Sequence, residues 1–562
     1  MSRGLAAGCL AAAAVALAGC AAVPDSGPVR VGRAVAPAGG GGLSDAIVRE
    51  VPAGPQPGAD PVQVVGGFLR AMVDSDGGYG VARSYLAPGA GWSAGAGITV
   101  YAEPTRVVRE GQSTVVVQAD RVGVLGAHGA YRVDPGTIRR RFEVSRRGGQ
   151  WRIAKLDSGV LLSTDDANRV LQPAALYFLT PDGGRLVPQP VLESPQQPGL
   201  ATTLMRGLVA GPGPLLAPGV RTAVPRGTTL LGNVPISADG VADIDLSAGA
   251  RQISAPQLRR LSAQVVWTMR QLSSVTAVRL FANGSPLEAP GVPSLQPVSS
   301  WPQFDPAVPP PSRGALFVHD GQVIGLGVPE PDGLRRRRVV AVTRNNDGSV
   351  IAAVRDGRSH QLLLVGTVDG GFRTRLRATA ISAPTFGPAA SVVAATSTGA
   401  VYSVSPGGAP LRVSLAGRLA RGVVRELSIS REGTRVAAVV GTASGSELDI
   451  ATVVSSGGRL SFREPRLILP ASAAVAGVAW ADADQIVTTV AGSGDRRGVL
   501  EISADGYRSR ELSGSGLPSA VDQVAAAPGE RVVAAGPAGS WELAGRRWRK
   551  LSAGAAPSYA GG

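Results

Sequence analysis

The clearest chemistry in this sequence lies at Cys20, where a short apolar segment ends. Arg3 precedes the segment, which reads GLAAGCLAAAAVALAGC, and Pro, Asp, Ser and Gly follow within eight residues. A positive start, an apolar stretch and small residues before a boundary are typical of a secretory signal peptide, and the stretch is too short for a stable membrane span. We therefore expect residues 1–19 to be removed, which leaves Cys20 as the first residue.

The four residues Leu17 to Cys20, LAGC, resemble the lipobox of bacterial lipoproteins. This resemblance implies that the Cys20 sulfur forms a thioether to diacylglycerol and that the Cys20 amino group is acylated, for example by palmitate. Residues 20–60 are rich in Pro, Gly and Ala and lack a periodic apolar face, so they predict a flexible tether. The expected location is the extracytoplasmic face of the cell membrane, with membrane lipid bound through Cys20.

Other residues match catalytic patterns only as strings. GWSAG at positions 91 to 95 fits G-x-S-x-G, but a nucleophile elbow needs a strand before the serine and a helix after it, and neither is predicted around Ser93. Asp243 and Asp482 are better explained as edge-strand and turn residues. No phosphate-binding glycine loop is present. We expect no catalytic residues and no cofactor, and the protein is predicted not to be an enzyme.

Composition excludes further classes of function. The only cysteines are Cys9 and Cys20, and the three histidines are far apart, so neither a disulfide framework nor a metal site is expected. The net charge is +15, but nearly all basic residues are scattered arginines, which a GC-rich genome produces without selection for nucleic acid. The run Arg335 to Arg338 is most simply a solvated loop, with a docking patch for an acidic partner as the alternative.

Two α/β domains are predicted after the tether. Residues 61–165 begin with a helix containing Val62, Val65 and Leu69, and continue with strands near Ile98, Ser113, Thr137 and Gln150. This α+β order resembles a nuclear-transport-factor-2-like (NTF2-like) domain. Residues 170–290 contain LYFLT, LVAGP, VPRGTTL, DGVADIDLS and VTAVRLFANG in an order that resembles the GerMN domain, which implies a small interaction domain without established catalytic residues.

The C-terminal half predicts a β-propeller. Residues 291–312 are proline-rich and favour a linker or a strap along a surface, and residues 313–562 repeat. Similar short strands recur at intervals of forty to fifty residues, which is typical of propeller blades, and turns such as NNDGS resemble those of TolB-type propellers. Five blades are clear, and a hairpin at Gly314, closed by strands from the other end, indicates a sixth; the total stays open. The repeated strands are anchored at Val350, Val392, Val436, Ile486 and Val532.

The whole arrangement is β-rich and multidomain, and it resembles the LpqB family of actinobacterial lipoproteins. The resemblance implies binding to the extracytoplasmic domain of a sensor histidine kinase in a two-component system of the MtrB/MtrA type, with effects on cell-wall and division homeostasis. Only Cys20 transfers as a functional residue. The alternative is a lipoprotein that binds a cell-wall polymer or a solute independently of the kinase.

Overall fold

The fold was analysed in a computed structural model of the chain, which describes residues 52–194, 199–307, 314–368, 371–491, 497–552 and 554–561. All of these residues belong to one compact unit. The signal peptide and Cys20 lie outside the described residues. Within the described part of the chain, no helix is long and apolar enough to cross a membrane.

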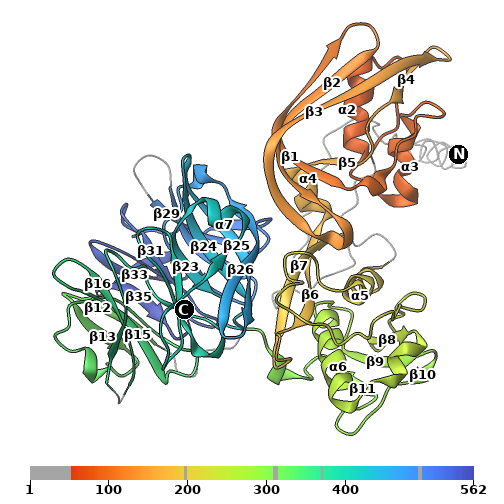
Figure 1. Cartoon of the computed structure of the whole chain (residues 1–562). Helices are drawn as coiled ribbons and strands as arrows, with labels where there is room; N and C mark the ends of the chain where they lie inside the picture. The colour runs from red at the N-terminus through yellow and green to blue at the C-terminus, as the bar shows by residue number, and fades with distance from the viewer. Residues whose placement is uncertain are drawn as a thin grey trace, which may run out of the picture. The chain divides into compact units, whose positions relative to one another are not determined.

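The N-terminal domain packs helices against a curved five-stranded sheet with the order β4-β3-β2-β1-β5 (Figure 1). Asp60 caps the first helix, where its carboxylate accepts a hydrogen bond from the Gln63 N–H, and the Gln63 side chain accepts one from the Asp60 N–H. The elements are α2 (Pro61–Ala71), α3 (Asp76–Ser84), β1 (Ile98–Glu110), β2 (Thr114–Leu125), β3 (Tyr131–Arg147), β4 (Gln150–Lys155), β5 (Val160–Ser163) and α4 (Thr164–Val170).

Strand β3 shows why the sheet has one apolar face. Ile138, Phe142 and Val144 are buried, whereas Arg139 and Glu143 are exposed, as the alternating pattern predicts. Phe142 packs edge-on against Phe68 of α2, with ring centroids 6.1 Å apart. The α+β class of this domain follows from this alternation, while the likeness to NTF2 stays a prediction.

The middle domain has a β-hairpin and a small sheet on either side of two helices (Figure 1). Residues Leu258, Leu261, Val265, Met269 and Leu272, which form one helical stripe, are all buried in its core. The two long strands of the sheet, β8 and β9, are parallel. The elements are β6 (Gln172–Leu179), β7 (Leu186–Glu193), α5 (Leu200–Ala210), β8 (Val241–Leu246), α6 (Ala255–Met269), β9 (Ala277–Ala282), β10 (Ser285–Pro286) and β11 (Leu295–Pro297).

The proline-rich segment predicted as a linker, 291–312, is in large part a structural strap. Strand β11 pairs with β9, and Trp301 and Phe304 lie in the core of the middle domain. The Trp301 indole N–H donates a hydrogen bond to the buried Gln296 side chain. Of the two alternatives for 291–312, a linker or a strap, residues 295–304 form a strap, because aromatic burial orders a segment that the prolines alone would leave extended.

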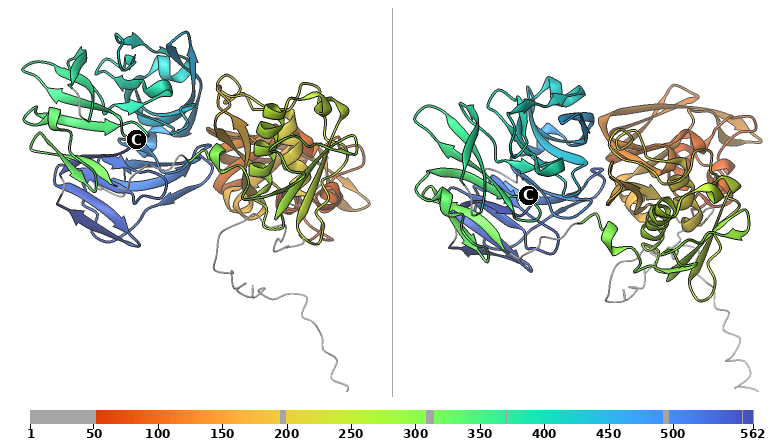
Figure 2. Two further views of the ribbon diagram at one scale, coloured as in Figure 1. Left: turned by 90° about the horizontal axis from the view of Figure 1, so that it is seen from below. Right: turned by 60° about the horizontal axis from the view of Figure 1, so that its bottom comes forward.

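The C-terminal described residues form six consecutive sheets (Figures 1 and 2). One edge strand of each sheet contributes residues to one cavity, so the sheets surround a common centre; these strands are β35, β14, β18, β23, β27 and β31. The strands of the first three sheets are β12 (Ala315–His319), β13 (Gln322–Leu326) and β35 (Ala555–Tyr559); β14 (Val339–Arg344), β15 (Val350–Asp356), β16 (Gln361–Thr367) and β17 (Arg373–Ala378); and β18 (Thr385–Phe386), β19 (Val392–Ala395), β20 (Val401–Val404) and β21 (Leu411–Arg412).

The other three sheets repeat the pattern, with one short helix, α7 (Gly417–Arg421), before the fourth. Their strands are β22 (Ser414–Leu415), β23 (Val423–Ile429), β24 (Arg435–Thr442), β25 (Gly445–Ser456) and β26 (Arg459–Leu469); β27 (Val478–Trp480), β28 (Gln485–Ala491), β29 (Arg497–Ser503) and β30 (Ser509–Glu511); and β31 (Gln523–Ala525), β32 (Val533–Gly536), β33 (Gly539–Ala544) and β34 (Arg547–Leu551).

The ring is closed by the two ends of this domain. Strand β12 begins the domain and pairs antiparallel with β35 at its end, as the hairpin at Gly314 predicts. This closure ties the end of the domain to its first sheet and so joins the first and last parts of the ring. Four of the repeated anchor residues lie in the strand next to the one that lines the central cavity, in β15, β19, β24 and β28, and Val532 directly precedes β32.

Candidate functional site

The residues that the sequence analysis weighed for catalysis are not assembled in the structure. Ser93 lies in an exposed loop followed by a short 3-10 turn and then by β1, so it lacks the strand and helix of a nucleophile elbow. Asp243 forms two hydrogen bonds to the Arg279 guanidinium, at 2.7 and 2.8 Å. In the described residues, no group of three or more His, Cys, Asp or Glu side chains is placed to hold a metal ion.

The described structure instead brings the three domains together at one junction. Tyr131 of the N-terminal domain packs edge-on against Tyr507 of the propeller, with ring centroids 5.0 Å apart. Leu215 of the middle domain packs against a core cluster of the propeller, and its carbonyl accepts a hydrogen bond from the Thr452 hydroxyl. Each domain thus lends side chains to the packing of another.

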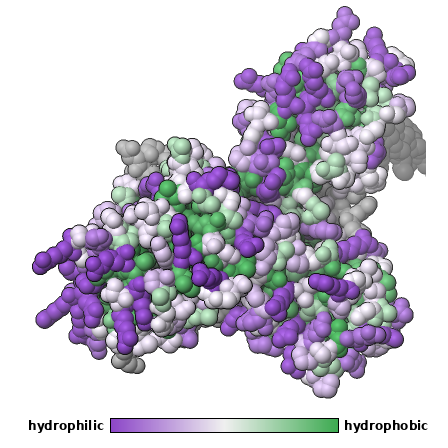
Figure 3. Space-filling view, in the orientation of Figure 1, coloured by the Kyte–Doolittle hydropathy of each residue, from purple (hydrophilic) through white to green (hydrophobic). Residues whose placement is uncertain are grey.

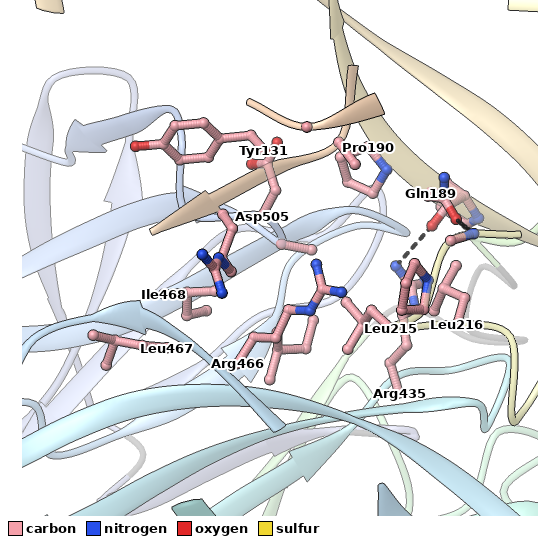
Figure 4. A pocket seen from close by; sticks show the side chains of 18 of the residues that line it. Tyr131, Gln189, Pro190, Leu215, Leu216, Arg435, Arg466, Leu467, Ile468 and Asp505 are labelled. Carbon is pink, nitrogen blue, oxygen red and sulfur yellow. Dashed lines mark hydrogen bonds between the residues drawn. The ribbon is translucent and has the colours of Figure 1, made fainter. Parts of the chain in front are cut away.

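A cavity of about 420 Å³ lies at this junction (Figure 4). This volume falls in the range of about 300 to 1,000 Å³ that small-molecule sites occupy. Its walls are mostly apolar and come from all three domains. The residues include Val124, Ala130, Pro188, Pro190, Leu215, Leu216, Ile450, Leu467 and Ile468.

Arg435 fixes one wall of the junction cavity. Its side chain is 1% exposed and donates hydrogen bonds to the Glu432 carboxylate at 2.8 Å and to the Ala483 carbonyl at 2.5 Å. It also reaches the Pro188 carbonyl of the middle domain, at 3.4 Å. The charge of Arg435 is thus already paired with Glu432, and its hydrogen bonds connect the propeller to the middle domain.

Arg466, on β26, differs from Arg435 because no described residue pairs with its guanidinium. Burial lowers the pKa of Arg466, and the neighbouring Arg132 lowers it further, while Glu464 partly opposes them. Both arginines line the cavity, and Figure 4 shows the Arg466 side chain among the apolar wall residues. The cavity therefore holds a guanidinium that forms no hydrogen bond or ion pair with the described side chains and is only partly balanced by Glu464.

The acidic residue on the cavity wall does not balance this charge. Asp505 accepts a hydrogen bond from the Ser503 hydroxyl at 2.5 Å and one from the Tyr507 N–H at 3.0 Å. Burial raises the pKa of Asp505 above its usual range. The carboxyl is thus satisfied locally in the turn after β29, and burial disfavours its charged form.

A second cavity, of about 230 Å³, forms the centre of the propeller. Glu426 of β23 lines it together with alanine and valine residues of neighbouring sheets. Burial, with a smaller effect of Asp522, raises the pKa of Glu426 to about 8. Ser428, two residues along the same strand, is 3% exposed, and its hydroxyl has no partner among the described residues.

Sequence reasoning missed both cavities. Tyr131, Leu215 and Arg466 are separated by long stretches of sequence and belong to different domains, so no local spacing links them. Glu426 lies in a strand reading VVRELSI, where it resembles an ordinary solvent-facing residue. A register shift between Val424 and Glu426 changes the strand here, and bulges of this kind are known to re-aim side chains.

Comparisons with known proteins agree with the domain order. The family described as "Lipoprotein LpqB, N-terminal domain" matches residues 54–168, and "Lipoprotein LpqB beta-propeller domain" matches residues 314–560. Between them, the family "Germane: Sporulation and spore germination" matches residues 175–288. The first GerMN domain of the sporulation protein GerM from Bacillus subtilis is 28% identical over 23% of this chain and 94% of that chain, with a TM-score of 0.19.

Two relatives of this chain share one name. A protein of Thermobifida fusca named "Lipoprotein LpqB" is 28% identical over 98% of this chain and 97% of the relative. One of Cutibacterium acnes with the same name is 36% identical over 56% of this chain, and the match spans about half of that relative, 53%. On the domain matches and these relatives together, the chain belongs to the LpqB family of lipoproteins.

Proposed function

We propose that this protein is a lipid-anchored accessory protein that binds the extracytoplasmic domain of a sensor kinase of the MtrB/MtrA type and regulates its signalling. The observation that carries the proposal is the sequence LAGC at Leu17 to Cys20, followed by a stretch rich in Pro, Gly and Ala and then by the described residues, which form one compact unit. This arrangement holds a folded body beside the membrane, where the outer domain of such a kinase is found.

The anchor determines what kind of binding is sufficient. Two or more acyl chains on Cys20 give stable attachment, whereas one chain would be marginal. Attachment to the same membrane raises the effective concentration of the kinase, so a weak interface suffices for regulation. A change of Cys20 to Ala should therefore release the protein from the membrane fraction without unfolding it.

A basic patch on the propeller offers the docking surface. Arg335, Arg336, Arg337 and Arg338 are all exposed, and they lead directly into β14. Arg358, in the loop between β15 and β16, and Arg377, near the end of β17, are exposed as well. Figure 3 shows hydrophilic side chains projecting from this side of the propeller, where β12, β13 and β16 lie in Figure 1. Its charge favours an acidic partner surface.

The family supports a binding role in preference to catalysis, since it is named for a lipoprotein and a propeller domain. A second candidate function is binding of a solute independently of the kinase. The junction cavity favours it, because that cavity has the size and apolar walls of a small-molecule site.

Calorimetric titration tests the first proposal. A chain beginning at Ala21, which keeps every described residue, is titrated with the purified extracytoplasmic domain of the cognate kinase. Saturable binding at micromolar concentration or tighter is expected. Absence of binding with both proteins folded would contradict direct regulation and favour the solute-binding role.

The patch is tested by replacing Arg335 to Arg338 with glutamine. Affinity for the kinase domain should fall at least about tenfold, and its dependence on salt should weaken. The matched control replaces Arg546, Arg547 and Arg549, which are also exposed on the propeller but lie in and around β34. Equal losses in both variants would indicate a non-specific charge effect and not a docking patch.

A further inference from the structure

The junction cavity combines two features that select for one chemistry. Its walls are apolar over most of their extent, with Leu215, Leu216 and Ile468 among them. A guanidinium without a described partner, that of Arg466, lies on the same wall. An apolar solute would leave this cation unpaired, whereas a small inorganic anion would leave the apolar walls without contacts.

The charges around the cavity add to this selection. Arg132 lies close enough to Arg466 to disfavour its charged form, and Arg435 is already paired with Glu432. Asp505 is held by Ser503 and by the backbone of its own turn. An anion brought to Arg466 would therefore gain an attraction that the described side chains leave unused.

Removal from water strengthens such an interaction. Charge-assisted hydrogen bonds from a guanidinium are about twice as strong as neutral ones, and Arg can contact carboxylate or phosphate with two parallel bonds. Apolar contact contributes in proportion to the apolar area that is removed from water. A ligand with an apolar chain and an anionic head would use both contributions at once.

We propose that the junction cavity binds a single-chain amphipathic anion, with its chain against Leu215, Leu216 and Ile468 and its carboxylate or phosphate on Arg466. This goes beyond kinase binding and does not depend on it. Because three domains line the cavity, the ligand stabilises their joint arrangement relative to the unfolded chain.

The test uses calorimetry with four probes that share a twelve-carbon chain. The chain beginning at Ala21 is titrated with dodecanoate, dodecyl phosphate, dodecanol and dodecyltrimethylammonium, all below their micellar concentrations. We expect one site per chain, with micromolar affinity for at least one anion, weaker binding of the alcohol and weakest binding of the cation. Dodecanoate and dodecyl phosphate distinguish a fatty-acid head from a phosphate head.

Two variants assign the site. Arg466→Ala should weaken binding of the preferred anion at least about tenfold and leave dodecanol unchanged. Its matched control is Arg463→Ala, which removes an exposed arginine from the same strand and should change nothing. Ala127→Trp, at an exposed position on the cavity wall, should weaken all four probes without lowering thermal stability.

The proposal is overturned by any of three results. The first is equal affinity for anionic, neutral and cationic heads, and the second is unchanged anion binding in Arg466→Ala. The third is absence of binding of all four probes to the folded protein. In the third case, binding of an apolar hexapeptide with a free carboxyl end would show that the cavity is a peptide site.

Discussion

The two cavities of this protein differ in charge, size and origin. The junction cavity, about 420 Å³, is built by three domains and carries the unpaired cation Arg466. The cavity at the centre of the propeller, about 230 Å³ and called the channel below, is built by one domain and carries the carboxyl of Glu426. The repeated sheets of the propeller generate the channel by their symmetry, whereas the junction exists only where unlike domains meet.

The two cavities also differ in how their ionisable side chains, Glu426 and Arg466, respond to burial. Glu426 can be neutral at physiological pH, because its raised pKa of about 8 lets it keep its proton. An arginine side chain does not lose its proton under these conditions, so Arg466 stays charged. An anionic group beside it would therefore be favourable. The channel can therefore remain self-contained, while the junction points to a ligand.

The largest expected effect concerns the buried ion pair of Glu432 and Arg435 at the junction. Glu432→Ala leaves Arg435 buried without its carboxylate, and breaking a buried pair costs about 3–5 kcal/mol. The free energy of unfolding, measured with urea, should fall by this amount.

The matched control is Asp332→Ala in the same propeller. Asp332 also pairs with an arginine three residues later, Arg335, but both side chains are largely exposed. Its loss should cost about 0–1 kcal/mol. Similar losses in both variants would mean that burial does not strengthen the dependence on Glu432.

A smaller effect is expected in the channel and depends on pH. Because the folded pKa of Glu426 is raised, the folded state binds more protons than the unfolded state between roughly pH 4.5 and pH 8. The stabilising contribution of Glu426 to the free energy of unfolding is therefore fully present below its unfolded pKa and is lost as the pH rises through its folded pKa. Asp522 also raises this pKa, by a smaller amount.

Glu426→Gln should remove that loss. Its melting temperature should match that of the natural chain near pH 5 and exceed it near pH 9, in thermal scans followed by circular dichroism. Glu511→Gln, at an exposed position in β30, serves as the control and should follow the natural chain at both pH values. If the melting temperature depended on pH in the same way in Glu426→Gln and in the natural chain, the pKa of Glu426 would not be raised.

The smallest expected effect concerns the contact between Tyr131 and Tyr507. Edge-on aromatic pairs contribute about 0.5–1.5 kcal/mol beyond their buried area. A double-mutant cycle with Tyr131→Leu and Tyr507→Leu should give a coupling energy in this range. A coupling of zero would mean that the two domains do not make this contact in solution.

Much of the fold could be predicted from local patterns. The alternation of Ile138, Phe142 and Val144 in β3 and the helical stripe of Leu258, Leu261 and Val265 identify buried faces directly, because side-chain direction follows the local period. The strands that recur from Val350 onward predict a propeller, because each repeat of forty to fifty residues has the length of one blade.

The junction could not be predicted in this way, and the strap was only one of two alternatives. Proline content indicated a linker or a strap at 291–312, and Trp301 and Phe304 within it pack into the middle domain. Two aromatic residues in a proline-rich segment were the available signal. Arg466 has no such signal, since it follows a register shift in β26 that begins after Arg463, and it becomes a site residue only when another domain covers it.

The central claim is that the junction, and not the channel, is the site for an anionic ligand. Crystals of the chain beginning at Ala21, grown with 12-bromododecanoate, would locate the ligand by the anomalous signal of bromine. Bromine is expected among the apolar residues around Leu215 and Ile468, with the carboxylate on Arg466. Bromine in the channel beside Glu426, or an ordered junction without ligand, would contradict it.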